Sequence, residues 1–252
     1  MAGNVGMHER LIIIGARGHG KVVADIAEHL GRYKDIAFLD DDDLEETMGI
    51  PVIGNSMDAY KYVDSSDIFV AIGNADVREK MLGQLWEKNA HVPTLVHLQA
   101  VIGTNVVLGA GTVVMAGAVV NPEAVIGKGC IINTCASVDH DCVIGNYVHV
   151  SVGTHIAGNV RVGANTWIGA GAVVKNNIEI CAGCTIGAGA VVVKNLQDTG
   201  TYIGVPAKVR TMEKSIQKVC EGGVKCNPLK FNKIIICIML LSAQSVWDRS
   251  VE

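Results

Sequence analysis

The amino-acid sequence predicts an N-terminal α/β domain followed by a parallel β-helix built of six-residue repeats. Two patterns support this prediction: an unbroken hexad pattern over residues 100–195, and a strand, glycine-rich turn and helix within residues 10–30. Composition is a third observation. The chain has 49% hydrophobic residues, 29 glycines and only 4% aromatic residues, which suits coils made of Val, Ile, Ala and Gly.

Residues 100–195 divide into sixteen hexads without an insertion, and the third position of every hexad is Ile, Val or Leu. The first position is small or β-branched, and glycine, asparagine and other turn-tolerant residues gather at positions four to six. One hexad is too short to bury its own aliphatic residue, so stacked coils must bury these residues together. Three short strands and three turns close a triangular coil, and sixteen hexads therefore predict roughly five coils.

In the N-terminal part, an apolar strand at residues 11–14 leads into the turn GARGHG. A helix follows, and its apolar side is expected to contain Val22, Val23, Ile26, Ala27 and Leu30. This layout presents backbone N–H groups and a positive helix end to phosphate. The glycine spacing is GxxGxG rather than GxGxxG, so an NAD site is a weak interpretation. A tight turn explains one or two of these glycines, but not easily three glycines and a histidine.

Two further strands are predicted at residues 36–39 and 67–72, giving a β-α-β-α-β domain in the first 95 or so residues. The earlier strand ends in four aspartates, residues 40–43, and the later one ends in Gly73 before a helix. Ligands of open α/β sheets bind at the carboxyl ends of strands, so these loops should share one crevice. Carboxylates there can accept hydrogen bonds from a ribose or a base, although a solvated acidic loop explains the last two aspartates.

Five segments occur in a characteristic order: GARGHGKVVADI, FLDDDD, AIGNADVREK, VDHDCVIGNYVHVSVGTHIAGNV and YIGVPAK. Together, over about residues 11–208, they resemble the bacterial sugar acetyltransferases of the NeuD and PglD type, which act on sialic acid or on UDP-linked amino sugars. The resemblance implies a Rossmann-like nucleotide-sugar domain at 8–95 and a left-handed β-helix at 96–208. Its handedness comes from the resemblance, because periodicity alone does not show it, and it departs from the usual right-handed crossover. Residues 209–252 would form an extension without an assigned role.

The resemblance also implies which residues bind the nucleotide sugar. It places Arg17, Gly18 and His19 at the nucleotide or its phosphates. It places Asp40 and Asp41 near the uridine, and Gly73 close to the ligand backbone. Members of the family often have serine where this chain has Arg17. An arginine at this turn can strengthen the binding of an anion, or it can point to solvent.

The hexad containing His140 and Asp141 predicts a catalytic base. These residues fall on a turn of the β-helix, where a neutral imidazole can take a proton near pH 7. A neighbouring carboxylate can orient the ring and favour the imidazolium. A turn histidine alone is more often structural than catalytic. The resemblance implies that His140 is the base and that the acid after it orients the ring, although the family often has the longer glutamate there.

The resemblance further implies that acetyl-CoA lies between neighbouring β-helices of a homotrimer. Its binding residues would be His149, Ala170 and Ala188. Position two of a hexad points outward, so His149 and His155 are both expected on the surface of the β-helix. His155 is expected to have no catalytic role.

The resemblance, together with the His140–Asp141 pair, implies direct transfer of acetyl from acetyl-CoA to a UDP-linked 4-amino-4,6-dideoxy sugar, without a metal. The first alternative is O-acetylation of sialic acid or CMP-sialic acid, since a hydroxyl acceptor needs the same base. A second is a zinc enzyme of the γ-carbonic anhydrase kind that uses histidines 140, 149 and 155. Their spacing does not match that kind of enzyme. A third, a non-catalytic nucleotide-sugar binding protein, leaves the His140–Asp141 pair unexplained.

Charge and cysteine content limit the partners and the compartment. The net charge of −4 argues against nucleic acid and anionic membranes as partners. The eight cysteines predict reduced thiols in a cytoplasmic protein, and a lone CxxC at Cys181 and Cys184 does not predict a zinc site. No signal peptide is recognised, a short helix is possible at 211–219, and the apolar run at 234–241 is too short to span a bilayer.

Overall fold

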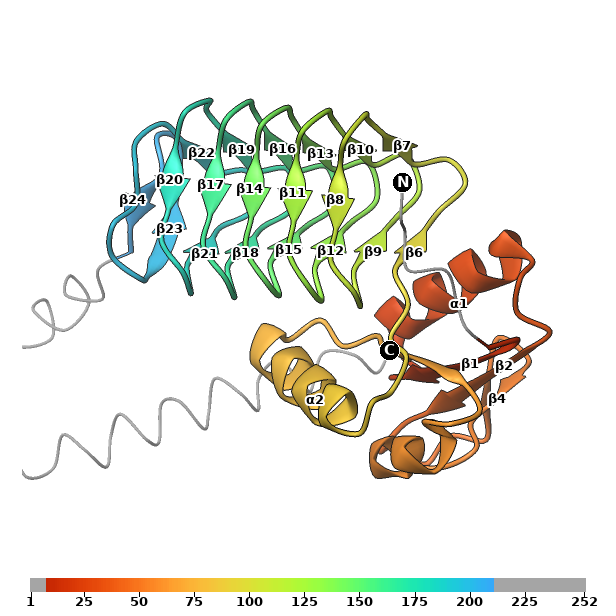
Figure 1. Cartoon of the computed structure of the whole chain (residues 1–252). Helices are drawn as coiled ribbons and strands as arrows, with labels where there is room; N and C mark the ends of the chain where they lie inside the picture. Colours follow the sequence, from red (N-terminus) through yellow and green to blue (C-terminus); the bar gives the residue numbers. More distant parts are fainter. Residues whose placement is uncertain (1–7, 211–252) are drawn as a thin grey trace, which may run out of the picture. The chain divides into compact units, whose positions relative to one another are not determined.

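The computed structural model describes residues 8–210 of the chain (Figure 1). Its N-terminal domain contains a parallel three-stranded sheet in the order β2-β1-β5, which confirms the predicted α/β architecture. The strands are β1 (Arg10–Ile14), β2 (Asp35–Leu39) and β5 (Asp67–Val70), and the α-helices are α1 (Gly18–Leu30) and α2 (Ala75–Glu87). The three strands therefore end at one edge, beside the turn that begins α1.

Two details of this domain differ from the sequence prediction. Between β2 and β5 the chain forms a short antiparallel pair, β3 (Glu46–Thr47) and β4 (Ile50–Pro51), and a 3-10 helix, η1 (Ser56–Tyr62), instead of an α-helix. A capping box between Asn55 and Asp58 starts η1. Val22 is 38% exposed, because the adjacent Val23 points into the core and successive helical side chains diverge by about 100°.

The hexads form a β-helix with three parallel sheets, and the strands β7 to β22 each occupy positions two and three of one hexad. The six-stranded sheet contains β7 (Val101–Ile102), β10 (Val119–Val120), β13 (Ser137–Val138), β16 (His155–Ile156), β19 (Val173–Val174) and β22 (Val191–Val192). The five-stranded sheet contains β8 (Val107–Leu108), β11 (Val125–Ile126), β14 (Val143–Ile144), β17 (Arg161–Val162) and β20 (Glu179–Ile180). Six strands on one face correspond to about six turns, slightly more than the roughly five predicted.

The third face is an eight-stranded sheet, because strands outside the hexads extend it at both ends. It contains β6 (Leu95–Val96), β9 (Val113–Val114), β12 (Ile131–Ile132), β15 (His149–Val150), β18 (Trp167–Ile168), β21 (Thr185–Ile186), β23 (Thr201–Ile203) and β24 (Lys208–Val209). The last two strands pair antiparallel, so the predicted closing segment ends the stack. The predictions for residues 211–219 and 234–241 lie outside the described residues.

The core of the β-helix is the column of third-position residues, with first-position residues between them. Threonine and cysteine are tolerated at position one because their side chains donate hydrogen bonds to carbonyls of the next coil. For example, Thr112 Oγ1 donates to the Gly127 carbonyl at 2.8 Å, and Cys142 Sγ lies 3.2 Å from the Ala157 carbonyl. Position six has positive φ in successive hexads, for example 60° at Asp141, which explains why turn-tolerant residues gather there.

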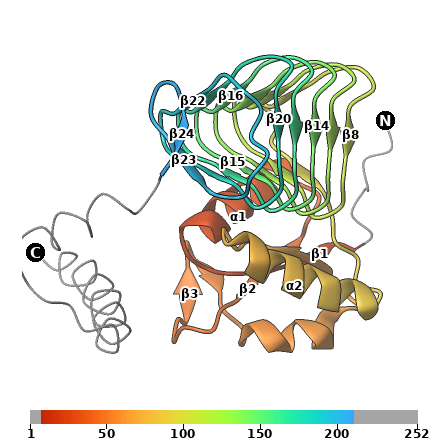
Figure 2. The same cartoon turned by 90° about the vertical axis from the view of Figure 1, so that its left-hand side faces the viewer.

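The N-terminal domain packs against the eight-stranded sheet of the β-helix. Leu95, Val113 and Ile131 share one buried cluster with Val23 of α1, and Tyr147 shares another with Leu82 of α2. Figure 2 shows α1 and α2 lying next to the β-helix. This contact covers one face of the β-helix and leaves the corner between the six- and five-stranded sheets outside it. Within residues 8–210, no helix is both long enough and apolar enough to cross a bilayer.

Candidate active site

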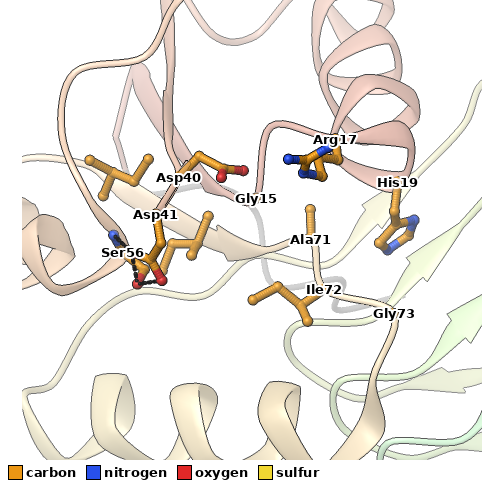
Figure 3. A pocket seen from close by; sticks show the side chains of 11 residues that line it. Gly15, Arg17, His19, Asp40, Asp41, Ser56, Ala71, Ile72 and Gly73 are labelled. Carbon is orange, nitrogen blue, oxygen red and sulfur yellow. Dashed lines mark hydrogen bonds between the residues drawn. The ribbon is translucent and has the colours of Figure 1, made fainter. Parts of the chain in front are cut away.

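A cavity of about 290 Å³ opens where β1, β2 and β5 end (Figure 3). Five of the six residues predicted to bind the nucleotide sugar line it: Arg17, His19, Asp40, Asp41 and Gly73. Gly18 is not among the lining residues and is the first residue of α1. The structure thus brings together residues from three separate segments, as expected from the ends of parallel strands.

Two aspartates at the end of β2 shape the cavity wall. Asp40 Oδ2 accepts a hydrogen bond from the Ala16 N–H at 2.6 Å, and Asp40 Oδ1 accepts one from the Asp42 N–H at 2.9 Å. Partial burial acts to raise the pKa of Asp40, but these two N–H donors hold it below the ordinary value. Asp41 accepts hydrogen bonds from Ser56 through its N–H at 2.9 Å and its hydroxyl at 2.7 Å. These bonds tie the glycine-rich turn and η1 to the end of β2.

Arg17 occupies the rim of the cavity and is largely exposed. Its Nε donates to Asp42 Oδ2 at 2.7 Å, and 74% of its side-chain surface is accessible. The guanidinium therefore meets a carboxylate of the acidic loop while it borders the cavity. The acidic loop that contains Asp42, which was expected to be solvated, is thus joined to the glycine-rich turn. The predicted anion-binding role of Arg17 stays a prediction.

Two histidines with lowered pKa values lie near Arg78. Burial, followed by the charge of Arg78, lowers the pKa of His19 to about 4. Burial, followed by Arg78 and His19, lowers the pKa of His149 to about 4. Both rings are therefore neutral at pH 7. Within the described residues, the buried Nε2 of His19 has no hydrogen-bond partner, and the residue lines the cavity.

Arg78 was assigned no role by the sequence analysis. It is 1% exposed, and its guanidinium donates to four backbone carbonyls. Two acceptors lie in the β-helix, Gly129 at 2.7 Å and Tyr147 at 2.6 Å. The other two follow β5, Ile72 at 2.8 Å and Gly73 at 2.9 Å. Its position on the buried side of α2 was a usable signal, because it precedes Leu82 by four residues and Leu85 by seven.

A second cavity of about 590 Å³ adjoins the first at Gly73. It lies between the start of α2 and the eight-stranded sheet, and its walls include His149 and Trp167. Asn133 Nδ2 lies 3.2 Å from His149 Nε2, and the rings of His149 and Trp167 are 6.4 Å apart. His149 is half-buried rather than simply exposed on the surface as expected, because the N-terminal domain covers this part of the sheet.

The other two residues predicted to bind acetyl-CoA do not line this cavity. Ala170 and Ala188 lie on stacked turns after β18 and β21, and the N–H of Gly189 donates to the Ala170 carbonyl at 2.9 Å. Ala170 and Ala188 therefore occupy equivalent positions at one corner of the β-helix, whereas His149 lies within β15 of the eight-stranded sheet. Their predicted contacts with acetyl-CoA stay predictions.

The predicted base and its orienting acid form a hydrogen-bonded pair on a turn. His140 Nδ1 lies 2.7 Å from Asp141 Oδ2, and the two side chains are 60% and 59% exposed. The hydrogen bond that His140 donates to Asp141, followed by the charge of Asp139, raises the pKa of His140. A proton on Nδ1 satisfies the carboxylate and leaves the Nε2 lone pair free to accept a proton. Gly158 lies against the ring, because a Cβ there would come 2.6 Å from Nε2.

One chain does not bring His140 to the cavity beside His149. His140 follows β13 and precedes β14, at the corner between the six- and five-stranded sheets, whereas the N-terminal domain covers the opposite, eight-stranded face. His155 occupies a third position, with Nδ1 2.8 Å from the Ser137 hydroxyl. The three histidines considered for a zinc site thus do not converge within a chain. Residues 8–210 contain no group of three His, Cys, Asp or Glu side chains that could hold a metal ion.

Two family models match the chain in agreement with this architecture. The PglD N-terminal domain matches residues 10–85, and the bacterial transferase hexapeptide (six repeats) matches residues 159–194. The acetyltransferase domain of PglB from Neisseria gonorrhoeae is 40% identical, with a TM-score of 0.79, over 81% of this chain and 100% of that chain. This likeness confirms the predicted left-handed β-helix.

Two other solved structures extend the comparison. PerB from Caulobacter crescentus, in complex with CoA and GDP-perosamine, is 37% identical with a TM-score of 0.76, over 80% of this chain and 97% of that chain. WeeI from Acinetobacter baumannii is 29% identical with a TM-score of 0.74, over 79% of this chain and 99% of that chain. Fold and site therefore define a hexapeptide-repeat acetyltransferase. The chain belongs to the PglD-type family of sugar acetyltransferases.

Proposed function

We propose that the protein transfers the acetyl group of acetyl-CoA to the amino group of a UDP-linked 4-amino-4,6-dideoxy sugar. The observation that carries this proposal is the His140–Asp141 pair, with Nδ1 and Oδ2 2.7 Å apart, on the β-helix of a sugar acetyltransferase. Acetyl-CoA is the co-substrate, and related structures contain acetyl-CoA or CoA.

His140 acts as the general base in direct transfer. The acceptor amine attacks the thioester carbonyl carbon, and Nε2 of His140 takes the proton that the amine loses. Asp141 holds Nδ1 and stabilises the imidazolium. The carbon–sulfur bond then breaks, and the imidazolium returns its proton to the departing CoA thiolate. The thioester is already activated, so this sequence requires no metal and no acyl-enzyme.

The acceptor nucleotide occupies the cavity at the ends of β1, β2 and β5. The start of α1, with Arg17, Gly18 and His19, provides a positive end for the phosphates. Asp40 and Asp41 are suited to the nucleoside, because they follow β2 at the position where acids meet ribose in related α/β sheets. Gly73 joins this cavity to the second one, so a sugar that extends past Gly73 approaches His149.

The active site forms between copies of the chain in a homotrimer. His140 and the nucleotide-sugar cavity lie on opposite sides of the β-helix, so one chain cannot present its own base to its own acceptor. A neighbouring copy can bring its His140–Asp141 corner to the side of the β-helix that carries His149, Ala170 and Ala188. Acetyl-CoA would lie in the groove between these two β-helices. The cytoplasm is the proposed compartment, in keeping with the free cysteines at 130, 135, 142, 181 and 184.

A GDP-linked amino sugar is a second candidate acceptor. The observation that favours it is the relative from Caulobacter crescentus. That relative is a GDP-perosamine N-acetyltransferase, and its structure contains both CoA and GDP-perosamine. The same base and the same cavity serve both candidates, which differ only in the nucleotide.

The experiment that tests the proposed function is mass spectrometry of acceptors incubated with acetyl-CoA and the purified protein. The panel contains a UDP-4-amino-4,6-dideoxy sugar, GDP-perosamine, sialic acid and CMP-sialic acid. A gain of one acetyl group on the UDP sugar, faster than on GDP-perosamine, supports the proposal. Faster acetylation of GDP-perosamine would change the proposed nucleotide from UDP to GDP. Acetylation of only the sialic acids would change the proposed reaction to O-acetylation. Omission of the protein gives the uncatalysed background.

A further inference from the structure

The segment after β5 touches both cavities, and one buried side chain holds it. Gly73 borders the nucleotide-sugar cavity and the cavity beside His149, and Ile72 lines the first of these. Arg78 Nη1 donates to both of their carbonyls, at 2.8 and 2.9 Å. A single guanidinium nitrogen therefore restrains two successive peptide groups of the cavity wall.

The other two nitrogens of the same guanidinium form hydrogen bonds with the β-helix. Its Nε and Nη2 donate to the carbonyls of Gly129 and Tyr147, which occupy equivalent positions on successive coils of the β-helix. Each coil is itself held by backbone bonds, such as the one from the Tyr147 N–H to the Lys128 carbonyl at 2.7 Å. The planar, fork-shaped guanidinium can serve these acceptors and the loop together, whereas a lysine ammonium cannot.

The charge of Arg78 also acts on the two histidines beside the junction. After burial, it is the next cause that lowers the pKa of His19 and of His149, so both rings stay neutral. Burial lowers the pKa of Arg78 itself to about 10, while Cys130 and Tyr147 oppose that shift, and the guanidinium remains charged at neutral pH.

We propose that Arg78 is a positioning residue that fixes the Ile72–Gly73 segment relative to His149. Through this segment it aligns an acceptor bound in the N-terminal cavity with the donor on the β-helix. This inference rests on the proposed function for its catalytic consequence, but the restraint of the segment does not depend on which substrate is used.

The first test is the steady-state kinetics of Arg78→Met and Arg78→Lys. In Arg78→Met the KM for the nucleotide sugar rises by about tenfold to a hundredfold, because a small displacement of the binding wall is costly. The KM for acetyl-CoA stays within about threefold, since the β-helix keeps its own backbone bonds. Arg78→Lys gives an intermediate increase. A protein that is merely less stable would lose active fraction and leave both KM values unchanged.

Glu79→Ala is the matched control. Glu79 is the next residue of α2, and its Oε2 accepts a hydrogen bond from Asn165 Nδ2 of the β-helix at 2.7 Å. This variant removes a contact between the same helix and the same β-helix without touching the Ile72–Gly73 segment. Both KM values should remain at the wild-type level. An equal rise in the nucleotide-sugar KM in Glu79→Ala would overturn the assignment to Arg78.

Hydrogen–deuterium exchange in the absence of substrate provides a readout independent of the reaction. Exchange of the amides at residues 71–75 should accelerate in Arg78→Met and remain unchanged in Glu79→Ala. If exchange is faster in Arg78→Met but the wild-type protein acetylates none of the offered acceptors, the proposed function is refuted and the restraint by Arg78 is retained. Unchanged exchange and an unchanged nucleotide-sugar KM in Arg78→Met would refute the positioning role.

Discussion

The Nδ1 atom of His140 lies 2.7 Å from Oδ2 of Asp141, the next residue in the chain. Adjacent residues rarely face each other in extended backbone, because their side chains point to opposite sides. Here the positive φ of Asp141, 60°, turns the chain so that the two side chains meet. The hexad turn therefore brings the pair together. Substitutions of these two exposed residues can test the proposed chemistry with few effects on the core.

Replacing His140 with alanine should lower kcat by about a hundredfold or more, because the attacking amine loses its proton acceptor. The melting temperature and the KM for acetyl-CoA should change little, since the side chain is exposed. The measurement is steady-state kinetics beside thermal unfolding. His155→Ala is the control, because His155 is also an outward histidine of the β-helix and should retain activity. Wild-type turnover in His140→Ala would remove this residue from the mechanism.

Replacing Asp141 with asparagine should shift the pH dependence of kcat. The base must be neutral, so activity rises as pH increases through the pKa of His140. The hydrogen bond to Asp141 and then the charge of Asp139 raise that pKa. Without the carboxylate that pKa falls, and the acidic limb moves to lower pH while the plateau decreases. Asparagine also tolerates positive φ, so the turn should survive. An acidic limb that does not move would contradict the assigned pair.

Replacing Gly158 with alanine should mimic part of the His140 defect. The new Cβ would lie 2.6 Å from His140 Nε2 and must displace the exposed ring. We expect kcat to fall by about tenfold or more, with the KM for the nucleotide sugar unchanged. Gly153→Ala is an informative contrast, because nothing lies within 4 Å of its added Cβ, although its positive φ adds backbone strain. Full activity of Gly158→Ala would show that the ring can move without consequence.

Replacing Asp40 with asparagine should weaken the glycine-rich turn and raise the KM for the nucleotide sugar. The loss of a charge-assisted acceptor for the Ala16 N–H should lower the free energy of unfolding by about 1–3 kcal/mol at pH 7. The pKa of Asp40 is below its ordinary value in the folded protein, so the wild-type advantage exists at neutral pH and disappears as pH falls through that lowered pKa. Denaturant unfolding at pH 7 and pH 3 checks both the size and the sign.

Mixed oligomers should reveal whether the active site lies between chains. We expect His140→Ala and Asp41→Ala homo-oligomers to be nearly inactive. Co-expressed together, they should regain part of the activity, because an intact cavity of one chain meets an intact His140 of another. Complementation should disappear when the purified variants are assayed separately. Absence of activity in verified mixed oligomers would contradict a shared site.

The hexad pattern made the β-helix predictable because it repeats one physical requirement, an inward aliphatic residue, at every sixth position. The cavity residues were predictable from strand ends and from the resemblance. The helical spacing of α2 indicated that Arg78 is buried, but its role could not be predicted, because that role depends on the carbonyls of Gly129 and Tyr147, which lie 51 and 69 residues away. The partial burial of His149 was missed for a similar reason. Outward position two indicates exposure only until another domain covers that face.

Residues 18 positions apart occupy the same site on successive coils, as Asn121 and Asp139 do. Equivalent positions on successive coils are therefore about 4.8 Å apart along the axis, the distance between neighbouring strands. Removal or duplication of one complete coil would move a side chain along the axis by this distance and keep it on the same corner. Enzymes with this scaffold can thus match the spacing between donor and acceptor to a longer or shorter substrate in whole coils, without redesigning the chemistry at the corner.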